Sequence, residues 1–188
     1  GLDLAASTVN GNLTATATTG NIEDSGVLTV TGNSSFTTSA NNATITLNNA
    51  NAFTGSVALS TTGSSAHATV VDASGLKLGT STVGGNLVAT ATEGDISDSG
   101  ILTITGAATF ITTEATQDII LNLDNVFTTT VTMQAGDGSA AFNDITFVDS
   151  GAVNLNSAAA TAGDLFIDAS TDLDVDGSLS ITATTGNI

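Results

Sequence analysis

A long internal repeat is the feature that most restricts the folds open to this chain. The stretch NGNLTATATTGNI (residues 10–22) returns as GGNLVATATEGDI (84–96), so that Leu13 corresponds to Leu87. Phe36 and Phe110 are separated by the same offset. A fixed period of this kind predicts a repetitive architecture, in which each unit buries its apolar face against its neighbours.

The period divides the chain into two full units and part of a third, at 2–75, 76–152 and 153–188. VVDASGLKL (70–78) realigns with FVDSGAVNL (147–155) at a slightly larger offset, so the second unit is the longer one. We expect one continuous segment, cut from a longer repetitive protein because the pattern is already under way at the first residue.

Each unit consists of short segments in which apolar and polar residues alternate. In NLTATAT, Leu13, Ala15 and Ala17 point to one side while Thr14 and Thr16 point to the other. Thr and β-branched residues favour extended chain, and the intervening Gly, Asn, Asp and Ser favour turns. No window places apolar residues at helical spacing, so we predict an all-β chain with almost no helix.

Two all-β architectures accept short strands at this spacing. Tandem immunoglobulin-like sandwiches are usually about 100 residues each and have bulky aromatic cores, whereas this chain has no Trp, Tyr or Pro. A parallel β-helix, or β-solenoid, suits small apolar residues and an occasional inward Phe, with Asn and Thr ladders at its corners. We therefore predict a parallel β-solenoid with coils of roughly 19–25 residues.

The charge balance excludes some partners. Eighteen acids stand against a single Lys or Arg, Lys77, which gives a net charge of −17. Nucleic acids and anionic membrane surfaces require basic patches, so neither is an expected partner. No apolar run is long enough to predict membrane insertion. The chain has no Cys, which removes disulfides and thiolate metal sites.

The phrase from residue 76, LKLGTSTVGGNLVATATEGDISDSGILTITG, resembles the repeats of filamentous-haemagglutinin-type exoproteins. These are large adhesins of bacterial two-partner secretion and related autotransporters. The resemblance covers essentially the whole chain. It implies a right-handed β-helix, secretion to the cell surface, and a role in adhesion, biofilm or filament formation. Neither a secretion domain nor a known adhesive motif is visible in the sequence.

One stretch, DLDVDGSLS (172–180), matches the opening of a calcium loop. Asp172, Asp174 and Asp176 alternate before a Gly, so their carboxylates can converge on one cation. Position 12 of such a loop, which prefers a bidentate Glu, is Ala183. The alternative interpretation is a strand with three solvent-facing Asp residues. The sequence therefore leaves calcium as an optional ligand, and no cofactor is required.

Paired acids recur at matching turns of the two units, Glu23/Asp24 and Asp95/Asp98. They are interpreted mainly as solvated turn residues, and weak calcium binding between coils is the alternative. Stacked carboxylates repel one another, so we also expect divalent cations to stabilise the chain without a tight site.

Outward T-x-T pairs suggest a surface ladder of the kind that binds ice, provided that the threonines are aligned in rows on one flat, uncharged face. The sequence cannot show that arrangement, and Thr is also a common polar strand residue. The candidate ladder residues are Thr14, Thr16, Thr29, Thr31, Thr44, Thr46, Thr90, Thr92, Thr103 and Thr105.

Catalysis is not expected. Two carboxylates suffice for glycoside cleavage, but a sugar-cleaving groove usually has aromatic platforms and basic residues. This chain has one Lys, one His and no Arg, Tyr or Trp. His67 has no matching His in the second unit and is interpreted as a surface residue. VGGNL lacks the Lys of a phosphate-binding loop and is interpreted as a turn.

The sequence favours a structural or adhesive segment of an extracellular bacterial surface protein or filament. Its expected partners are copies of itself, stacked coil on coil or head to tail, and a host or cell-surface receptor. Two alternatives remain open: an ice- or surface-binding solenoid, and a calcium-stabilised adhesin repeat built as tandem β-sandwiches.

Overall fold

The computed structural model describes residues 1–137, 143–151, 153–160, 165–169 and 173–174. In this part all regular structure is strand, which confirms the all-β prediction. The strands are β1 (Leu2–Leu4), β2 (Ser7–Val9), β3 (Leu13–Ala17), β4 (Ile22–Asp24), β5 (Leu28–Val30), β6 (Ser34–Thr38), β7 (Ile45–Phe53), β8 (Val57–Ser60), β9 (Ala68–Asp72), β10 (Leu76–Leu78), β11 (Ser81–Val83), β12 (Leu87–Ala91), β13 (Ile96–Asp98), β14 (Leu102–Ile104), β15 (Ala108–Thr112), β16 (Ile119–Phe127), β17 (Thr130–Ala135), β18 (Ile145–Asp149), β19 (Val153–Ala160), β20 (Leu165–Ala169) and β21 (Leu173–Asp174).

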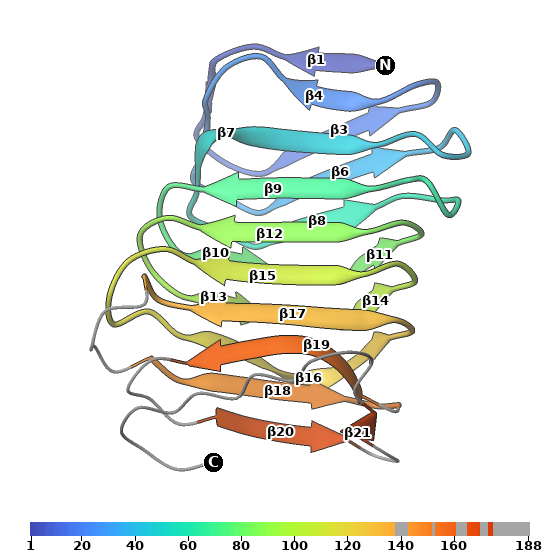
Figure 1. The fold of residues 1–188 in the computed structure, drawn as a ribbon. Coiled ribbons are helices and arrows are strands. Elements are labelled where there is room, and N and C mark those ends of the chain that lie inside the picture. The colour runs from blue at the N-terminus through green and yellow to red at the C-terminus, as the bar shows by residue number, and fades with distance from the viewer. Residues whose placement is uncertain (138–142, 152, 161–164, 170–172, 175–188) are drawn as a thin grey trace.

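Each strand pairs in parallel with a strand one coil away, which is the arrangement of a β-solenoid (Figure 1). The front stack follows the order β1-β4-β7-β9-β12-β15-β17-β19-β21. The shortest step between register partners in this stack runs from Ala68 to Leu87, and the longest runs from Thr132 to Ser157. The solenoid prediction is confirmed. The alternative of tandem sandwiches is wrong, because the sheets of such domains are antiparallel.

Equivalent strands of successive repeats lie on opposite sides of the rod. β4 lies in the front stack of Figure 1, but its equivalent in the second repeat, β13, lies in the back stack. Conversely, β6 lies at the back and its equivalent β15 at the front. Since a coil contains about 21 residues, one repeat makes about three and a half coils. Each repeat is therefore turned by about half a revolution relative to the preceding one.

The rod has a flat side and a bent side, and the two exchange places with each repeat. In the first repeat the back is flat, with β3, β6 and β8 paired in one ladder. The front is bent, because β4 and β5 are separate short strands that both pair with the long strand β7. On the front, β9 at the end of the first unit and β12, β15 and β17 of the second unit form the other flat side, while β13 and β14 pair with β16 on the bent back.

A single apolar core runs along the described coils. It is filled by alternate strand residues, mostly Ala, Val, Ile and Leu. The predicted inward Phe residues are buried in it. Phe36 packs edge-to-face on Phe53, and Phe110 packs in the same way on Phe127, both with ring centroids 5.9 Å apart. Small apolar side chains fit this narrow interior, which explains why the composition is poor in aromatics.

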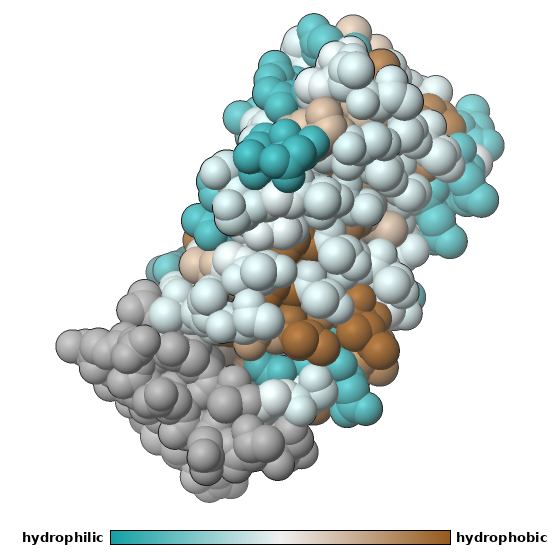
Figure 2. Space-filling view, turned by 90° about the vertical axis from the view of Figure 1, so that its right-hand side faces the viewer, coloured by the Kyte–Doolittle hydropathy of each residue, from teal (hydrophilic) through white to brown (hydrophobic). Residues whose placement is uncertain are grey.

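On the side of the rod drawn in Figure 2, residues of intermediate hydropathy cover most of the surface. Figure 2 shows the rod from the side, where most of the surface is pale and a small brown group adjoins the grey region. The described residues contain no helix that is long and apolar enough to cross a membrane.

Candidate functional site

The two flat sides are the most regular surfaces of the rod. On the first, outward residues form two rows across β3, β6 and β8, and none is charged. The rows are Thr14, Ser35 and Ala58, and Thr16, Thr37 and Ser60. Parallel pairing in register places equivalent side chains about 4.8 Å apart along each row.

The second flat side repeats this arrangement on the other side of the rod, with one more strand. Its outward rows across β9, β12, β15 and β17 are Thr69, Val88, Thr109 and Thr132, and Val71, Thr90, Ile111 and Gln134. Again none of these residues is charged. We call this surface, defined by these eight residues, the second flat face.

The threonines of the predicted ladder are all at least partly exposed, but they are divided among different sides. Thr14 and Thr16 lie on β3 at the back, while Thr90 lies on β12 at the front. Thr29 and Thr103 lie on short strands of the two bent sides. Aligned rows therefore exist, but their members are register partners from successive coils and not equivalent residues of successive repeats. Sequence reasoning missed Ser35, Thr37, Thr109 and Ile111, whose alignment requires the register.

Polar ladders close the corners, as predicted. Asn12 Oδ1 accepts a hydrogen bond from the Asn33 N–H (2.9 Å), and Asn33 Oδ1 accepts one from the Ser56 N–H (3.0 Å). His67 is exposed and belongs to a similar ladder, since its Nδ1 accepts the Asn86 N–H at 2.9 Å. Its contacts are those of a surface residue that satisfies backbone donors at a corner.

The second repeat uses aspartates for one of these ladders. Asp95 Oδ1 accepts the Asp118 N–H (2.9 Å), and Asp118 Oδ1 accepts the Asp144 N–H (2.7 Å). Burial raises the pKa of Asp118; the hydrogen bond from Asp144 lowers it, and the charges of Asp95 and Asp144 raise it further. These carboxylates therefore already serve as acceptors for backbone donors. Within the described ranges, no group of three or more His, Cys, Asp or Glu side chains is placed to hold a metal ion.

Asp24, which the sequence suggested was solvated, is instead a buried acceptor at the bend of the first repeat. Its carboxylate accepts the N–H groups of Asn48 and Asn49 at 3.0 and 3.2 Å and the Asn51 side-chain amide at 2.8 Å. Asn51 Oδ1 in turn accepts the Leu28 N–H. This interpretation of Asp24 was wrong, because the chain folds over it in the next coil.

The second repeat rebuilds the same network. Asp98 accepts the N–H groups of Asn122 and Leu123 and the side-chain amide of Asn125, whose Oδ1 accepts the Leu102 N–H. Reciprocal side-chain-to-backbone bonds of this kind satisfy the polar groups that a bend would otherwise leave unpaired. The recurring acids at 24 and 98 are therefore structural in geometry.

Two further aspartates, Asp72 and Asp149, occupy equivalent positions in the two full repeat units. Asp72 pairs in register with Asn51 of the preceding coil, and Asp149 pairs with Asn125. Desolvation raises the pKa of both carboxyls, and hydrogen bonds from Ser74 and Gly151 respectively oppose the shift. These positions end β9 and β18, near the ends of the first and second repeat units.

The predicted calcium ligands Asp172 and Asp176 lie outside the described residues. Asp174 belongs to β21, whose backbone pairs with β19 through Asn154. Calcium binding at this stretch stays a prediction.

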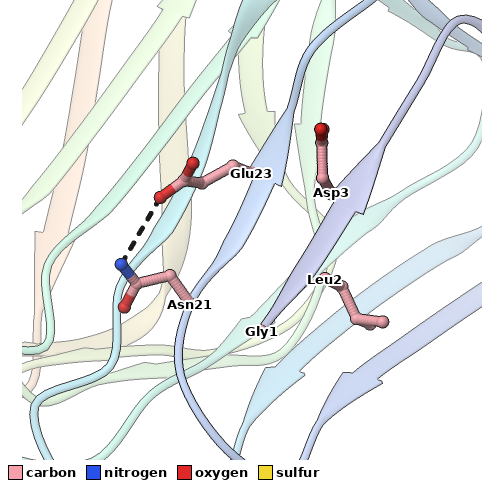
Figure 3. Close-up of a pocket in the computed structure, with 5 residues that line it drawn as sticks. All are labelled: Gly1, Leu2, Asp3, Asn21 and Glu23. Atoms are coloured by element: carbon pink, nitrogen blue, oxygen red, sulfur yellow. Dashed lines mark hydrogen bonds between the residues drawn. The ribbon is translucent and has the colours of Figure 1, made fainter.

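A shallow pocket of about 280 Å³ lies at the outer side of the first coil (Figure 3). It is lined by Gly1, Leu2, Asp3, Asn21 and Glu23, and Glu23 accepts a hydrogen bond from Asn21. The equivalent of Leu2 in the second repeat, Leu76, is fully buried.

Comparison with known proteins identifies the repeat but gives it no activity. No curated protein and no solved structure matches the chain. Residues 1–60 and 65–134 match the DUF5649 repeats of unknown function. The two matched segments cover more than half of the chain and fall within its first two units. The chain therefore belongs to the DUF5649 repeat family.

Proposed function

We propose that this chain is a structural segment of an exported bacterial surface protein or extracellular filament, with no catalytic role. Its membership of a repeat family and its solenoid fold support a structural role. The resemblance to filamentous-haemagglutinin-type repeats supports the surface location and a contribution to adhesion or biofilm. The observation that carries the proposal is the parallel register, which links each described coil to the next through one core.

The mechanism is propagation from coil to coil. At the boundary between the two repeats, β8 and β9 provide the template on which β10, β11 and β12 are laid. The Gly79 N–H donates to the Val57 carbonyl, and the Ala68 N–H donates to the Asn86 carbonyl. Each coil thus satisfies the backbone groups and covers the apolar face of its neighbour.

The partners in this proposal are further coils of the same type, joined along the rod or head to tail between molecules. A host or cell-surface receptor is a second partner class. The side chains that such a receptor would meet are the hydroxyls and small apolar groups of the two flat sides.

The test is a series of chains with one to four tandem copies of the first unit (2–75). Each added unit should lengthen the particle by about 17 Å, because about three and a half coils stack at about 4.8 Å each. The melting temperature should rise with repeat number and then level off. Small-angle scattering and thermal melting measure both quantities.

A matched series carries Val70→Asp in every copy and should not form the rod, since Val70 is completely buried. A particle whose length does not grow with repeat number, or units that melt independently, would refute the structural role. Antibody labelling of intact cells of the source bacterium tests the surface location separately.

A further inference from the structure

We propose that the second flat face is a lateral docking surface for the same face of a second copy of this chain. Propagation along the axis makes a rod longer, whereas this contact places two rods side by side. The inference rests on the rod of the proposed function but requires a different surface.

Charge is the first argument for a second copy as the occupant. Two chains that each carry a net charge of −17 repel one another over most of their surfaces. The eight outward residues of the second flat face carry no charge. Glu93 and Glu114 lie beyond the ends of β12 and β15, at the margin of the face. Two rods can therefore approach through this face at a lower electrostatic cost than through the acidic parts of the surface. The first flat side is also uncharged, but its outward rows hold only one aliphatic residue, Ala58.

Spacing and shape are the second argument. The outward rows repeat at about 4.8 Å, a period that another parallel β-solenoid presents in the same form. Three of the eight side chains, Val71, Val88 and Ile111, are outward aliphatic groups that are already half-buried by their neighbours. Two stacked sheets separated by about 10 Å interdigitate such β-branched side chains. The contact is isologous, with each copy contributing the same residues.

The area sets the strength of the contact. Four strands of about five residues span roughly 19 Å by 17 Å, a footprint of about 300 Å² per copy. A standard stable interface needs about 800 Å² per partner. One pair of faces therefore gives a weak dimer. Because the first repeat presents its own flat side on the opposite side of the rod, longer arrays can hold neighbours on both sides and gain from avidity.

The experiment is sedimentation velocity of the full chain over a range of concentrations, at low and high salt. The weight-average mass should rise with concentration, and added salt should promote the association by screening the acids. Thr90→Glu places a charge within the face and should raise the dimer dissociation constant at least about tenfold.

Thr103→Glu is the matched control, because it adds the same charge to a half-exposed threonine of β14 on the bent side. It should leave association close to that of the parent chain. Circular dichroism and melting of both variants establish that the coils remain folded. An equal mixture of Thr90→Glu and Thr90→Lys should associate more tightly than either variant alone.

Three results would overturn the proposal. One is a chain that stays monomeric at every concentration and salt level. Another is an equal loss of association in Thr90→Glu and Thr103→Glu. The third is a monomer whose Thr90 variant loses inhibition of ice recrystallisation, which would assign the face to ordered water. Each leaves the tandem-repeat length series unaffected, so failure of lateral docking is distinguishable from failure of the rod.

Discussion

The first coil and its equivalent in the second repeat have nearly the same sequence pattern but different burial. Leu2 is 36 % exposed and Leu13 is partly exposed, whereas Leu76 and Leu87 are completely buried. The leucines and the strand lengths are the same. The difference is that β8 and β9 lie on the outer side of the second coil. Burial in this molecule is therefore supplied by the neighbouring coil more than by the unit itself.

The most disruptive way to probe this comparison is to truncate the two equivalent leucines. Leu76→Ala should cost about 2–5 kcal/mol of unfolding free energy, because it removes buried methyl groups and leaves a cavity between coils. Leu2→Ala should cost less than about 1 kcal/mol, since its side chain is already partly hydrated. Urea unfolding measures both. Equal losses at the two positions would show that the coils are stabilised independently of their neighbours.

A smaller loss of unfolding free energy is expected from the hydrogen-bond network of Asp24 and Asn51, which the second repeat rebuilds with Asp98 and Asn125. Asn51→Ala removes the acceptor of the Leu28 N–H and a donor to Asp24, and should cost about 1–3 kcal/mol. Asn125→Ala should cost a similar amount, because its contacts are equivalent. The exposed Asn48→Ala keeps its backbone bond and should stay within about 0.5 kcal/mol of the parent. Equal losses of unfolding free energy in Asn51→Ala and Asn48→Ala, measured by chemical denaturation, would contradict a stabilising role for the Asn51 side chain.

A pH effect is expected from Asp72, the buried carboxyl at the end of β9. Burial raises the pKa of Asp72 above its ordinary value of 3.8, so the folded chain holds that proton more tightly than the unfolded chain. The stabilising contribution is complete below the unfolded pKa and is lost as pH rises through the higher folded pKa. Through this group, stability should therefore increase on acidification from neutral pH.

Asp72→Asn should flatten this pH dependence, measured as the midpoint of urea unfolding across a pH series. Asp124→Asn removes the same formal charge from an exposed residue and is the matched control. Identical pH profiles for the two variants would mean that the dependence comes from overall charge and not from the buried carboxyl.

The smallest effect should come from two exposed apolar residues at equivalent turns. Val27 and Ile101 are 43 % and 47 % exposed, and they precede β5 and β14 on opposite sides of the rod. Val27→Ser and Ile101→Ser should each change unfolding free energy by no more than about 0.5 kcal/mol. A large loss at only one of them, in the same denaturation assay, would show that the two bent sides are not equivalent.

The sequence was sufficient to predict the strands, the inward residues and the parallel stacking. Alternation in segments such as LTATA indicates which side chains face the core, and the scarcity of aromatics favours a narrow interior. The inward positions of Phe36, Phe53, Phe110 and Phe127 follow from the same alternation, and all four are buried.

The half turn between repeats was not predicted, because the period of the sequence counts residues and not coils. Only the register shows that one repeat passes about three and a half times around the axis. The threonine rows depend on the same information: Thr16 has Thr37 beside it, whereas its sequence equivalent Thr90 lies on the opposite side. The role of Asp24 was missed because its partners come from β7, one coil later.

Cysteine pairs test the central claim most directly, since the chain has no cysteine of its own. Thr16 and Thr37 are register partners on β3 and β6, at the spacing of about 4.8 Å that permits a disulfide. The double variant Thr16→Cys/Thr37→Cys should form an intramolecular disulfide under mild oxidation. Thr16→Cys/Thr90→Cys should not, because half a turn and several coils separate the two positions. A disulfide between 16 and 90 would contradict the half-turn relation of the repeats, and the absence of one between 16 and 37 would contradict the coil-on-coil register.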